Sequence, residues 1–220
     1  MKSPSKTYSF TNRAKTFGNM WRVYSYKCDK SFVLHSDREL AHWILFLEFD
    51  PDVESFDLNP PSRRLDVGIG QKETTLDAEV VRRNGLIEWH EIKMGYFDKE
   101  VYSTPQIDLQ RNIAQKNHVK YVIFNDSDFM PLKSRIMPLL KVEACLAFGR
   151  RISTSAMVEH EVGLFFGKGN TGTLGRYLDK FSDQELERML YIFSRKFSEG
   201  VIDVEFTKSF FSRKNVWVTR

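Results

Sequence analysis

The chain has 220 residues, of which 41% are hydrophobic, with a formal net charge of +4 and a pI near 9.0. This length and apolar content suit one large domain or two small ones and exclude a disordered protein. No apolar run approaches the roughly 20 residues that a membrane helix needs, and the N-terminus lacks the apolar segment of a signal peptide. The isolated Cys28 and Cys145 argue against structural zinc and favour a reducing, cytoplasmic location.

Basic side chains gather at the N-terminus, where aromatic residues separate them. The first thirty residues contain one acid, Asp29, and seven basic residues: Lys2, Lys6, Arg13, Lys15, Arg22, Lys27 and Lys30. Two interpretations stay open. The segment is either a polar arm or first strand with solvated charges, or an arm whose cations contact DNA phosphates.

Helix and strand patterns alternate up to about residue 128. Residues 36–50 predict a helix, because Ser36 and Glu39 form a capping box and apolar residues recur at helical spacing. Residues 53–70 predict a short strand followed by a loop. A second helix is expected at 104–117 and an apolar strand at 119–126, which together indicate an α/β domain with a mixed sheet.

The remaining chain changes character. Residues 132–149 predict a helix broken at Pro138, and 161–178 contain a glycine-rich turn. Residues 182–200 predict a helix opened by a second capping box, Ser182 to Glu185, and 201–220 predict two strands around a basic turn with Arg213 and Lys214. We therefore expect an α/β domain over 1–130 and a small winged-helix-like domain over 131–220.

Residues 76–94 (LDAEVVRRNGLIEWHEIKM) predict a β-hairpin around Asn84-Gly85. A two-residue loop places Asp77 opposite Ile92, with Glu91 and Lys93 on the other face. A three-residue loop, with Gly85 in the left-handed conformation, places Asp77 opposite Glu91 and puts Lys93 on the same face. An Asn-Gly pair fits either loop.

In the second register the hairpin has the chemistry of a phosphodiester hydrolysis site. Opposed carboxylates repel, and a divalent cation such as Mg²⁺, which prefers carboxylate oxygens, turns that repulsion into binding. Lys93 would orient or help deprotonate an attacking water. In the simpler alternative Glu91 and Lys93 lie on a solvated strand face and Glu39 only caps its helix. His90 alternates away from Glu91 and predicts a packing or surface residue.

Three further polar residues are candidates near this site. Glu48 is a rival acid to Glu39, but it lies on the other side of the same helix. Gln106 and Gln110 are within reach of DNA if the second helix faces it, although a solvated helix face is the expected role for both.

The order of these blocks resembles the PD-(D/E)xK nuclease superfamily and, more narrowly, the TnsA endonuclease subunit of heteromeric Tns-type transposases. The segments that carry the resemblance span roughly residues 36–128: SDRELAHWILFLEFDPDVESFDLNP, TTLDAEVV, HEIK and VKYVIFNDSD. The catalytic set of the family falls on Glu39, Asp77, Glu91 and Lys93. Leu76 stands where the superfamily name implies proline, and Glu91 stands where some members carry glutamine.

The resemblance implies a restriction-endonuclease-like fold and a Mg²⁺-dependent endonuclease in which Mn²⁺ can substitute. Asp77, Glu91 and the backbone carbonyl of Ile92 would ligate the metal, Glu39 would help to hold a second ion or its water, and Lys93 would position the nucleophilic water. Such a subunit cuts the 5′-side strand of double-stranded DNA at transposon ends, while a DDE-type transposase cuts and joins the other strand. The C-terminal domain would contact DNA and an AAA+ regulator.

Three alternatives remain at this point. The chain is either a stand-alone restriction or repair nuclease with the same core, a catalytically inert subunit that bridges DNA and partner proteins, or a winged-helix regulator with an accessory domain.

Overall fold

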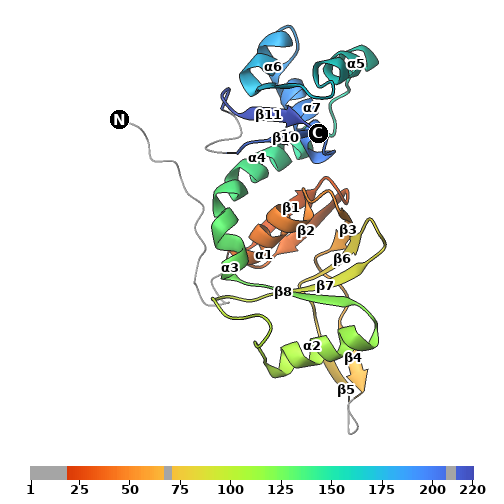
Figure 1. Cartoon of the computed structure of the whole chain (residues 1–220). Helices are drawn as coiled ribbons and strands as arrows, with labels where there is room; N and C mark the ends of the chain where they lie inside the picture. The colour runs from red at the N-terminus through yellow and green to blue at the C-terminus, as the bar shows by residue number, and fades with distance from the viewer. Residues whose placement is uncertain (1–18, 67–70, 207–211) are drawn as a thin grey trace. The chain divides into compact units, whose positions relative to one another are not determined.

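The computed structural model describes residues 19–66, 71–206 and 212–220. The chain divides into two compact units between Lys133 and Ser134 (Figure 1), just after the predicted boundary at residue 130. The N-terminal residues Lys2, Lys6, Arg13 and Lys15 lie outside the described residues. In the described part of the chain, no helix is both long and apolar enough to cross a membrane.

The first unit is built on a mixed four-stranded sheet with the order β3-β6-β7-β8. β3 and β6 run antiparallel, as do β6 and β7, whereas β7 and β8 run parallel and are joined through α2. The predicted second helix, apolar strand and parallel crossover are therefore confirmed. The elements of this core are α1 (Asp37–His42), β3 (Val53–Asp57), β6 (Ala78–Arg82), β7 (Ile87–Ile92), α2 (Pro105–Lys116) and β8 (Lys120–Phe124).

Helices cover both faces of this sheet, as Figure 1 shows for α1 and α2. On one face Trp89 of β7 packs with Ile113 and Ala114 of α2. On the other face His42 of α1 contacts His90, the next residue of β7. Because successive residues of a strand point to opposite faces, these contacts place the two helices in separate layers around the sheet. The unit is a layered α/β structure.

The first helix starts as predicted and then changes its geometry. The Ser36 side chain caps α1 by accepting a hydrogen bond from the Glu39 N–H. From Trp43 to Leu47 the chain continues as a π-helix, η2, and the Glu48 N–H donates to the Trp43 carbonyl at 2.9 Å. A π-turn contains one more residue than an α-turn, which changes the direction of the side chains that follow.

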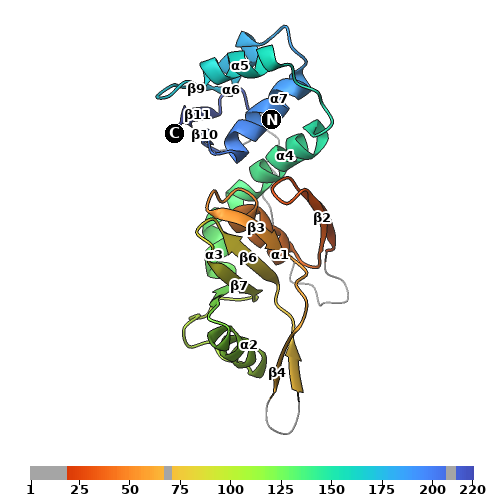
Figure 2. The ribbon, with the colours of Figure 1, turned by 90° about the vertical axis from the view of Figure 1, so that its right-hand side faces the viewer.

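Two further hairpins in this unit were not predicted. The basic N-terminal region contains β1 (Trp21–Ser25) and β2 (Lys30–Leu34), and the expected loop after β3 contains β4 (Arg63–Asp66) and β5 (Gln71–Thr74). Both pairs are antiparallel. The β4 strand and its partner extend beside α2 (Figure 2). The unit ends with α3 (Asp126–Phe129) and a short 3-10 turn, η3 (Met130–Leu132).

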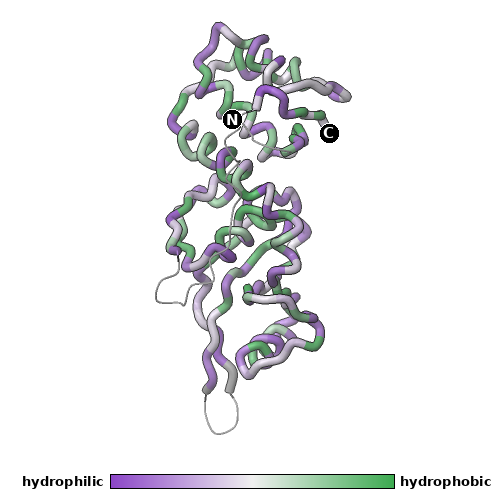
Figure 3. The backbone as a smooth tube through the Cα atoms, turned by 90° about the vertical axis from the view of Figure 1, so that its left-hand side faces the viewer, coloured by the Kyte–Doolittle hydropathy of each residue, from purple (hydrophilic) through white to green (hydrophobic). Residues whose placement is uncertain are grey.

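The second unit combines helices with a three-stranded antiparallel sheet in the order β10-β11-β9. The two predicted C-terminal strands are present, and the predicted glycine-rich turn lies between α5 and β9, where Gly169 has a φ of +81°. Hydrophobic and hydrophilic residues alternate along the helices of both units (Figure 3). The elements in chain order are α4 (Lys133–Gly149), α5 (Ala156–Phe165), β9 (Thr171–Thr173), α6 (Leu174–Lys180), α7 (Leu186–Ser198), β10 (Ile202–Val204) and β11 (Val216–Thr219).

Aromatic side chains form the core of the second unit. Phe166 lies edge-to-face on Trp217 with 4.8 Å between ring centroids, and Tyr177 packs on Phe193 at 5.3 Å. The buried Tyr177 hydroxyl donates to the Met189 carbonyl at 3.0 Å. Large rings with one satisfied polar group bury much apolar area, so this small unit has a core of its own.

Two predictions about the helices of this unit are wrong. α4 runs through Pro138 without a break. Since Pro138 lies in the second turn, its missing N–H costs the helix only the bond to the Ser134 carbonyl. α7 starts at Leu186, and Glu185 is its N-cap residue without a side-chain cap bond. The expected capping box from Ser182 to Glu185 therefore does not form.

Candidate active site

The hairpin of β6 and β7 has the three-residue loop. β6 pairs with β7 from Ala78–His90 to Val81–Ile87, which leaves Arg83-Asn84-Gly85 as the loop. Asp77 comes just before β6, and its N–H donates to the His90 carbonyl at 3.1 Å. The Arg82 N–H donates to the Leu86 carbonyl at 2.8 Å across the loop, and Gly85 has a φ of +83°. A positive φ is the conformation that this loop requires and that glycine adopts without strain. Of the two registers open in the sequence, the structure has the one that brings the two acids together.

Glu91 is buried, with an exposed fraction of 2%. One of its oxygens, Oε1, pairs with the Lys93 ammonium. The other oxygen, Oε2, accepts a 2.8 Å hydrogen bond from the side-chain amide of Gln110. The alternative of a solvated strand face is therefore wrong for Glu91. Lys93 is accessible, since 23% of its side chain is exposed.

The other expected site residues shift the pKa of Asp77. Its Oδ2 accepts a 2.6 Å hydrogen bond from the Ile92 N–H. Burial raises the pKa of Asp77 to about 7, assisted by the charges of Glu91 and Glu39, while the Ile92 N–H and Lys93 oppose the rise. An ionised Asp77 is thus unfavourable next to Glu91 without a cation. Asp77 thus bonds to the Ile92 backbone and lies close enough to Glu91, Glu39 and Lys93 for their charges to shift its pKa.

Glu39 has a local role in addition to its place near Asp77. It occupies the third position of α1, and its Oε2 accepts from the His35 N–H at 2.8 Å. Its Oε1 accepts from the Ser36 hydroxyl at 3.0 Å. The carboxylate therefore stabilises the start of the helix, but through His35 and the serine hydroxyl rather than through the Ser36 backbone.

Among the described residues, no group of three or more His, Cys, Asp and Glu side chains has the arrangement of a metal site. The three carboxylates of the expected set each accept hydrogen bonds from a neighbouring donor: Ile92 for Asp77, Gln110 for Glu91 and His35 for Glu39.

Three other polar residues of the first unit differ in their roles. The rival acid Glu48 is fully buried and accepts from the Ser25 hydroxyl at 2.6 Å and from the Trp43 indole at 3.0 Å. It thus joins β1 to η2 as a structural carboxylate. Gln106 is exposed as expected, but Gln110 is completely buried, so the expected solvated face is wrong for Gln110.

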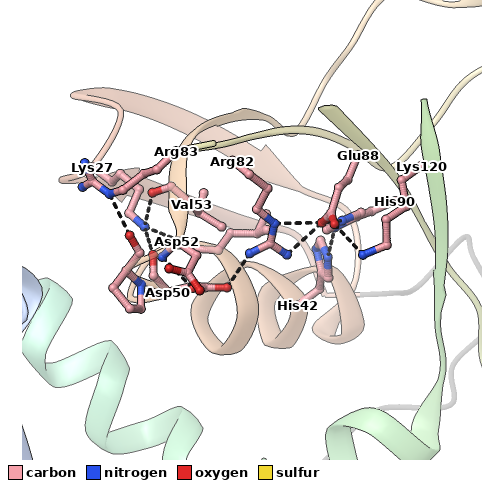
Figure 4. Close-up of polar contacts among 12 residues, drawn as sticks. Lys27, His42, Asp50, Asp52, Val53, Arg82, Arg83, Glu88, His90 and Lys120 are labelled. Atoms are coloured by element: carbon pink, nitrogen blue, oxygen red, sulfur yellow. Dashed lines mark hydrogen bonds and ion pairs between the residues drawn. The ribbon is translucent and has the colours of Figure 1, made fainter. Parts of the chain in front are cut away.

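The opposite face of the sheet holds a separate buried polar network (Figure 4). His42 Nε2 lies 2.9 Å from His90 Nδ1, and His90 Nε2 lies 3.1 Å from Glu88. Glu88 also pairs with Arg82 and Lys120. Hydrogen bonding with His90, then with Lys120 and Arg82, holds the pKa of Glu88 far below its ordinary value, although burial opposes this. His90 is therefore a packing residue, as its alternation predicts.

A surface pocket of about 610 Å³ lies beside this network, lined by Asp52, Arg82, Arg83, Asn84, Leu86, Glu88 and Lys120. Glu88 and Glu91 are an odd number of residues apart in β7, so their side chains point to opposite faces. The pocket therefore belongs to the face of Glu88, away from Asp77 and Glu91, and its cations Arg82 and Lys120 are already paired with Glu88.

The basic turn of the second unit is partly engaged in structure. The Arg213 guanidinium pairs with Asp179 of α6 and lies 3.4 Å from the Gly175 carbonyl. Arg213 therefore attaches the segment before β11 to α6. Lys214 is exposed.

No known protein family matches the chain, and no curated protein is similar to it in sequence.

Proposed function

We propose that the chain is a metal-dependent DNA endonuclease subunit of a heteromeric transposase, which cleaves the 5′-side strand at transposon ends. The observation that carries the proposal is the proximity of two carboxylates, the half-buried Asp77 and the buried Glu91, with Lys93 paired to Glu91 and Glu39 close enough to act on Asp77. Repelling carboxylates in a protein interior are unfavourable unless a cation binds between them or a proton is retained.

The chemistry of these donors fits Mg²⁺, with Mn²⁺ as a substitute. Asp77 and Glu91 supply carboxylate oxygens, and the Ile92 carbonyl and Glu39 would complete the set of oxygen ligands that Mg²⁺ prefers. When bound, the metal stabilises negative charge on the phosphoryl oxygens.

The residues of the chain have distinct tasks in this proposal. The Ile92 N–H holds Asp77 Oδ2, so Asp77 keeps one orientation. Lys93 is the accessible cation beside Glu91, and its ammonium would orient the attacking water by donating a hydrogen bond to the water oxygen. Glu39 starts α1 and, from there, adds negative charge to the same site.

The fold supports the same reading. A helix, three antiparallel strands and a parallel crossover through α2 follow in the order that the restriction-endonuclease-like resemblance implies. In the second unit, the order α5, β9, α6, α7, β10, β11 with the sheet order β10-β11-β9 supports a winged helix. By resemblance we assign to it contacts with double-stranded DNA and an AAA+ regulator, next to a DDE-type transposase subunit.

The test uses end-labelled DNA that carries the terminus of the element, Mg²⁺ and the co-encoded transposase. We expect a 5′-side cut with the wild type that is lost with Asp77→Ala and Lys93→Met. Glu79→Gln is the matched control, because Glu79 lies on β6 only two residues after Asp77 and accepts from the Trp89 indole. It should still cut.

Two results would favour other functions. Equal cutting by wild type and Asp77→Ala would place the chemistry elsewhere and leave a subunit that bridges DNA and partners. Cutting of unrelated DNA by this chain without the transposase would indicate a stand-alone restriction or repair nuclease.

A further inference from the structure

We infer that Gln110 and Tyr121 form a positioning pair that holds the Glu91 carboxylate in the orientation the proposed metal site requires. Neither residue belongs to the set derived from the sequence. The inference rests on the proposed function, because it assigns how one of the proposed ligands is oriented.

The side-chain amide of Gln110 is fully hydrogen-bonded in one orientation. Its Nε2 donates to Glu91 Oε2 at 2.8 Å and to the Thr75 carbonyl at 3.1 Å. Its Oε1 accepts from the Tyr121 hydroxyl at 2.6 Å. An ionised carboxylate and a carbonyl oxygen can only accept, so the group between them has to be the NH₂ end of the amide.

Tyr121 makes this orientation unique. A flipped amide would direct its oxygen at Glu91 and Thr75 and lose both of those bonds, and it would leave the tyrosine hydroxyl facing an NH₂ group. Burial and the charge of Glu91 keep the pKa of Tyr121 far above its ordinary value, so the hydroxyl stays protonated and donates. Tyr121 therefore donates to Gln110, and Gln110 in turn donates to Glu91.

Packed secondary structure holds Gln110 and Tyr121 in place. Gln110 is completely buried on α2, and the helix packs through Ile113 and Ala114 onto Trp89 of β7. Glu91 lies two residues beyond Trp89 on that strand, and Tyr121 lies on the adjacent parallel strand β8. Helix, strand and crossover thus fix all three side chains relative to one another, and such outer hydrogen bonds usually set the geometry of a ligating carboxylate.

Gln106 provides a matched control one turn earlier on the same helix. It also approaches the site, but its contacts are longer, at 3.3 Å to Lys93 Nζ and 3.4 Å to Glu91 Oε1. Gln106 is exposed, whereas Gln110 is buried. If proximity of any glutamine amide were sufficient, the two would be equivalent. The inference requires that only Gln110 matters.

The experiment measures Mn²⁺ binding to the full chain by isothermal titration calorimetry, without DNA. We compare the wild type with Gln110→Met, Tyr121→Phe, their double variant and Gln106→Met. Loss of such an outer hydrogen bond typically weakens metal affinity by about 10–100-fold. We expect that loss for Gln110→Met, a smaller loss for Tyr121→Phe, and affinity close to wild type for Gln106→Met. The double variant should match Gln110→Met, because the two residues act in series.

Cleavage assays supply a second readout. A positioning role predicts that kcat falls while the KM for DNA is unchanged, and that raising Mn²⁺ recovers part of the rate. A purely structural role would lower the stability of the apo chain and leave Mn²⁺ affinity and kcat of the folded fraction unaltered. Circular dichroism in EDTA separates the two.

Each outcome decides the question. Wild-type affinity for Mn²⁺ in folded Gln110→Met overturns the positioning role and leaves the proposed function intact. If Gln110→Met does not fold, Tyr121→Phe decides, and wild-type affinity in that variant overturns the inference. If the wild type binds Mn²⁺ no better than Asp77→Ala, both the inference and the proposed metal site fail.

Discussion

Replacing Asp77 with asparagine should make the metal-free protein more stable. The substitution keeps the shape and an oxygen that accepts from the Ile92 N–H. It removes a carboxylate whose ionised form is unfavourable next to the buried Glu91. The substitution that abolishes the proposed activity is thus expected to increase the free energy of unfolding in EDTA.

The magnitude follows from the pKa. Burial, with the charges of Glu91 and Glu39, raises the pKa of Asp77 from 3.8 to about 7. Each pKa unit corresponds to about 1.4 kcal/mol, so ionised Asp77 costs the fold at most about 4 kcal/mol. The folded state prefers the protonated acid. The contribution of Asp77 to the free energy of unfolding is therefore most favourable at low pH and is lost as pH rises through about 7. We expect a gain for Asp77→Asn of about 1 kcal/mol near pH 4.5 and about 4 kcal/mol near pH 8.

Urea unfolding in EDTA at both pH values measures the gain as the difference between variant and wild type, which removes the contribution of other titrating groups. Adding Mn²⁺ at high pH should stabilise the wild type and leave the variant unchanged. A gain that is the same at both pH values, or no gain at high pH, would refute the reasoning, because Asp77 would then not be a buried acid next to a charged partner.

Two further predictions concern stability and use the same urea assay. Glu88→Gln removes the buried carboxylate that pairs with Arg82 and Lys120 and should lower the free energy of unfolding by about 3 kcal/mol at neutral pH. In the matched variant Lys120→Gln the side chain that is replaced is 57% exposed, and the free energy of unfolding should change by less than about 1 kcal/mol. Because the pKa of Glu88 is lowered in the folded protein, its stabilising effect is present above its ordinary pKa of 4.5 and is lost as pH falls. Equal stability of Glu88→Gln and wild type at neutral pH would contradict a stabilising role of the buried network. In Gly149→Ala the new Cβ would lie 2.1 Å from the Tyr191 ring, so the free energy of unfolding should fall by about 2 kcal/mol or more. In the matched variant Gly163→Ala the new Cβ meets no atom within 4 Å, so the free energy of unfolding should rise by about 0.5–1 kcal/mol.

The hairpin shows how far local sequence can predict this site. Asn84-Gly85 predicts a turn, but both loop lengths satisfy its backbone preferences. The structure ties the loop to the turn before β3, where the Arg83 N–H donates to the Asp52 carbonyl at 2.9 Å and its guanidinium reaches the Pro51 carbonyl at 2.7 Å. These partners lie some thirty residues away in the chain. The register therefore depends on contacts that no local pattern contains.

The burial of Gln110 is a feature that the sequence analysis missed although a signal existed. It stands three residues after the buried Ile107 and three before Ile113, and thus within the apolar stripe of α2. A polar residue in such a stripe is buried and needs hydrogen-bond partners. The two errors in the second unit have a different cause. Pro138 lies early enough in α4 that it removes a single helical hydrogen bond, and α7 starts after Glu185 rather than after Ser182, so neither local signal marks where the helix breaks or begins.

The three-residue loop between β6 and β7 has a consequence for how this chain can diverge. The same residues could close a two-residue loop only if β6 shifted by one residue against β7, which would turn Asp77 and Glu91 to opposite faces. The positive φ of Gly85 therefore helps to select the register as well as the turn. In homologous chains, the sequence at this tip should be free to drift provided that one position still accepts a positive φ.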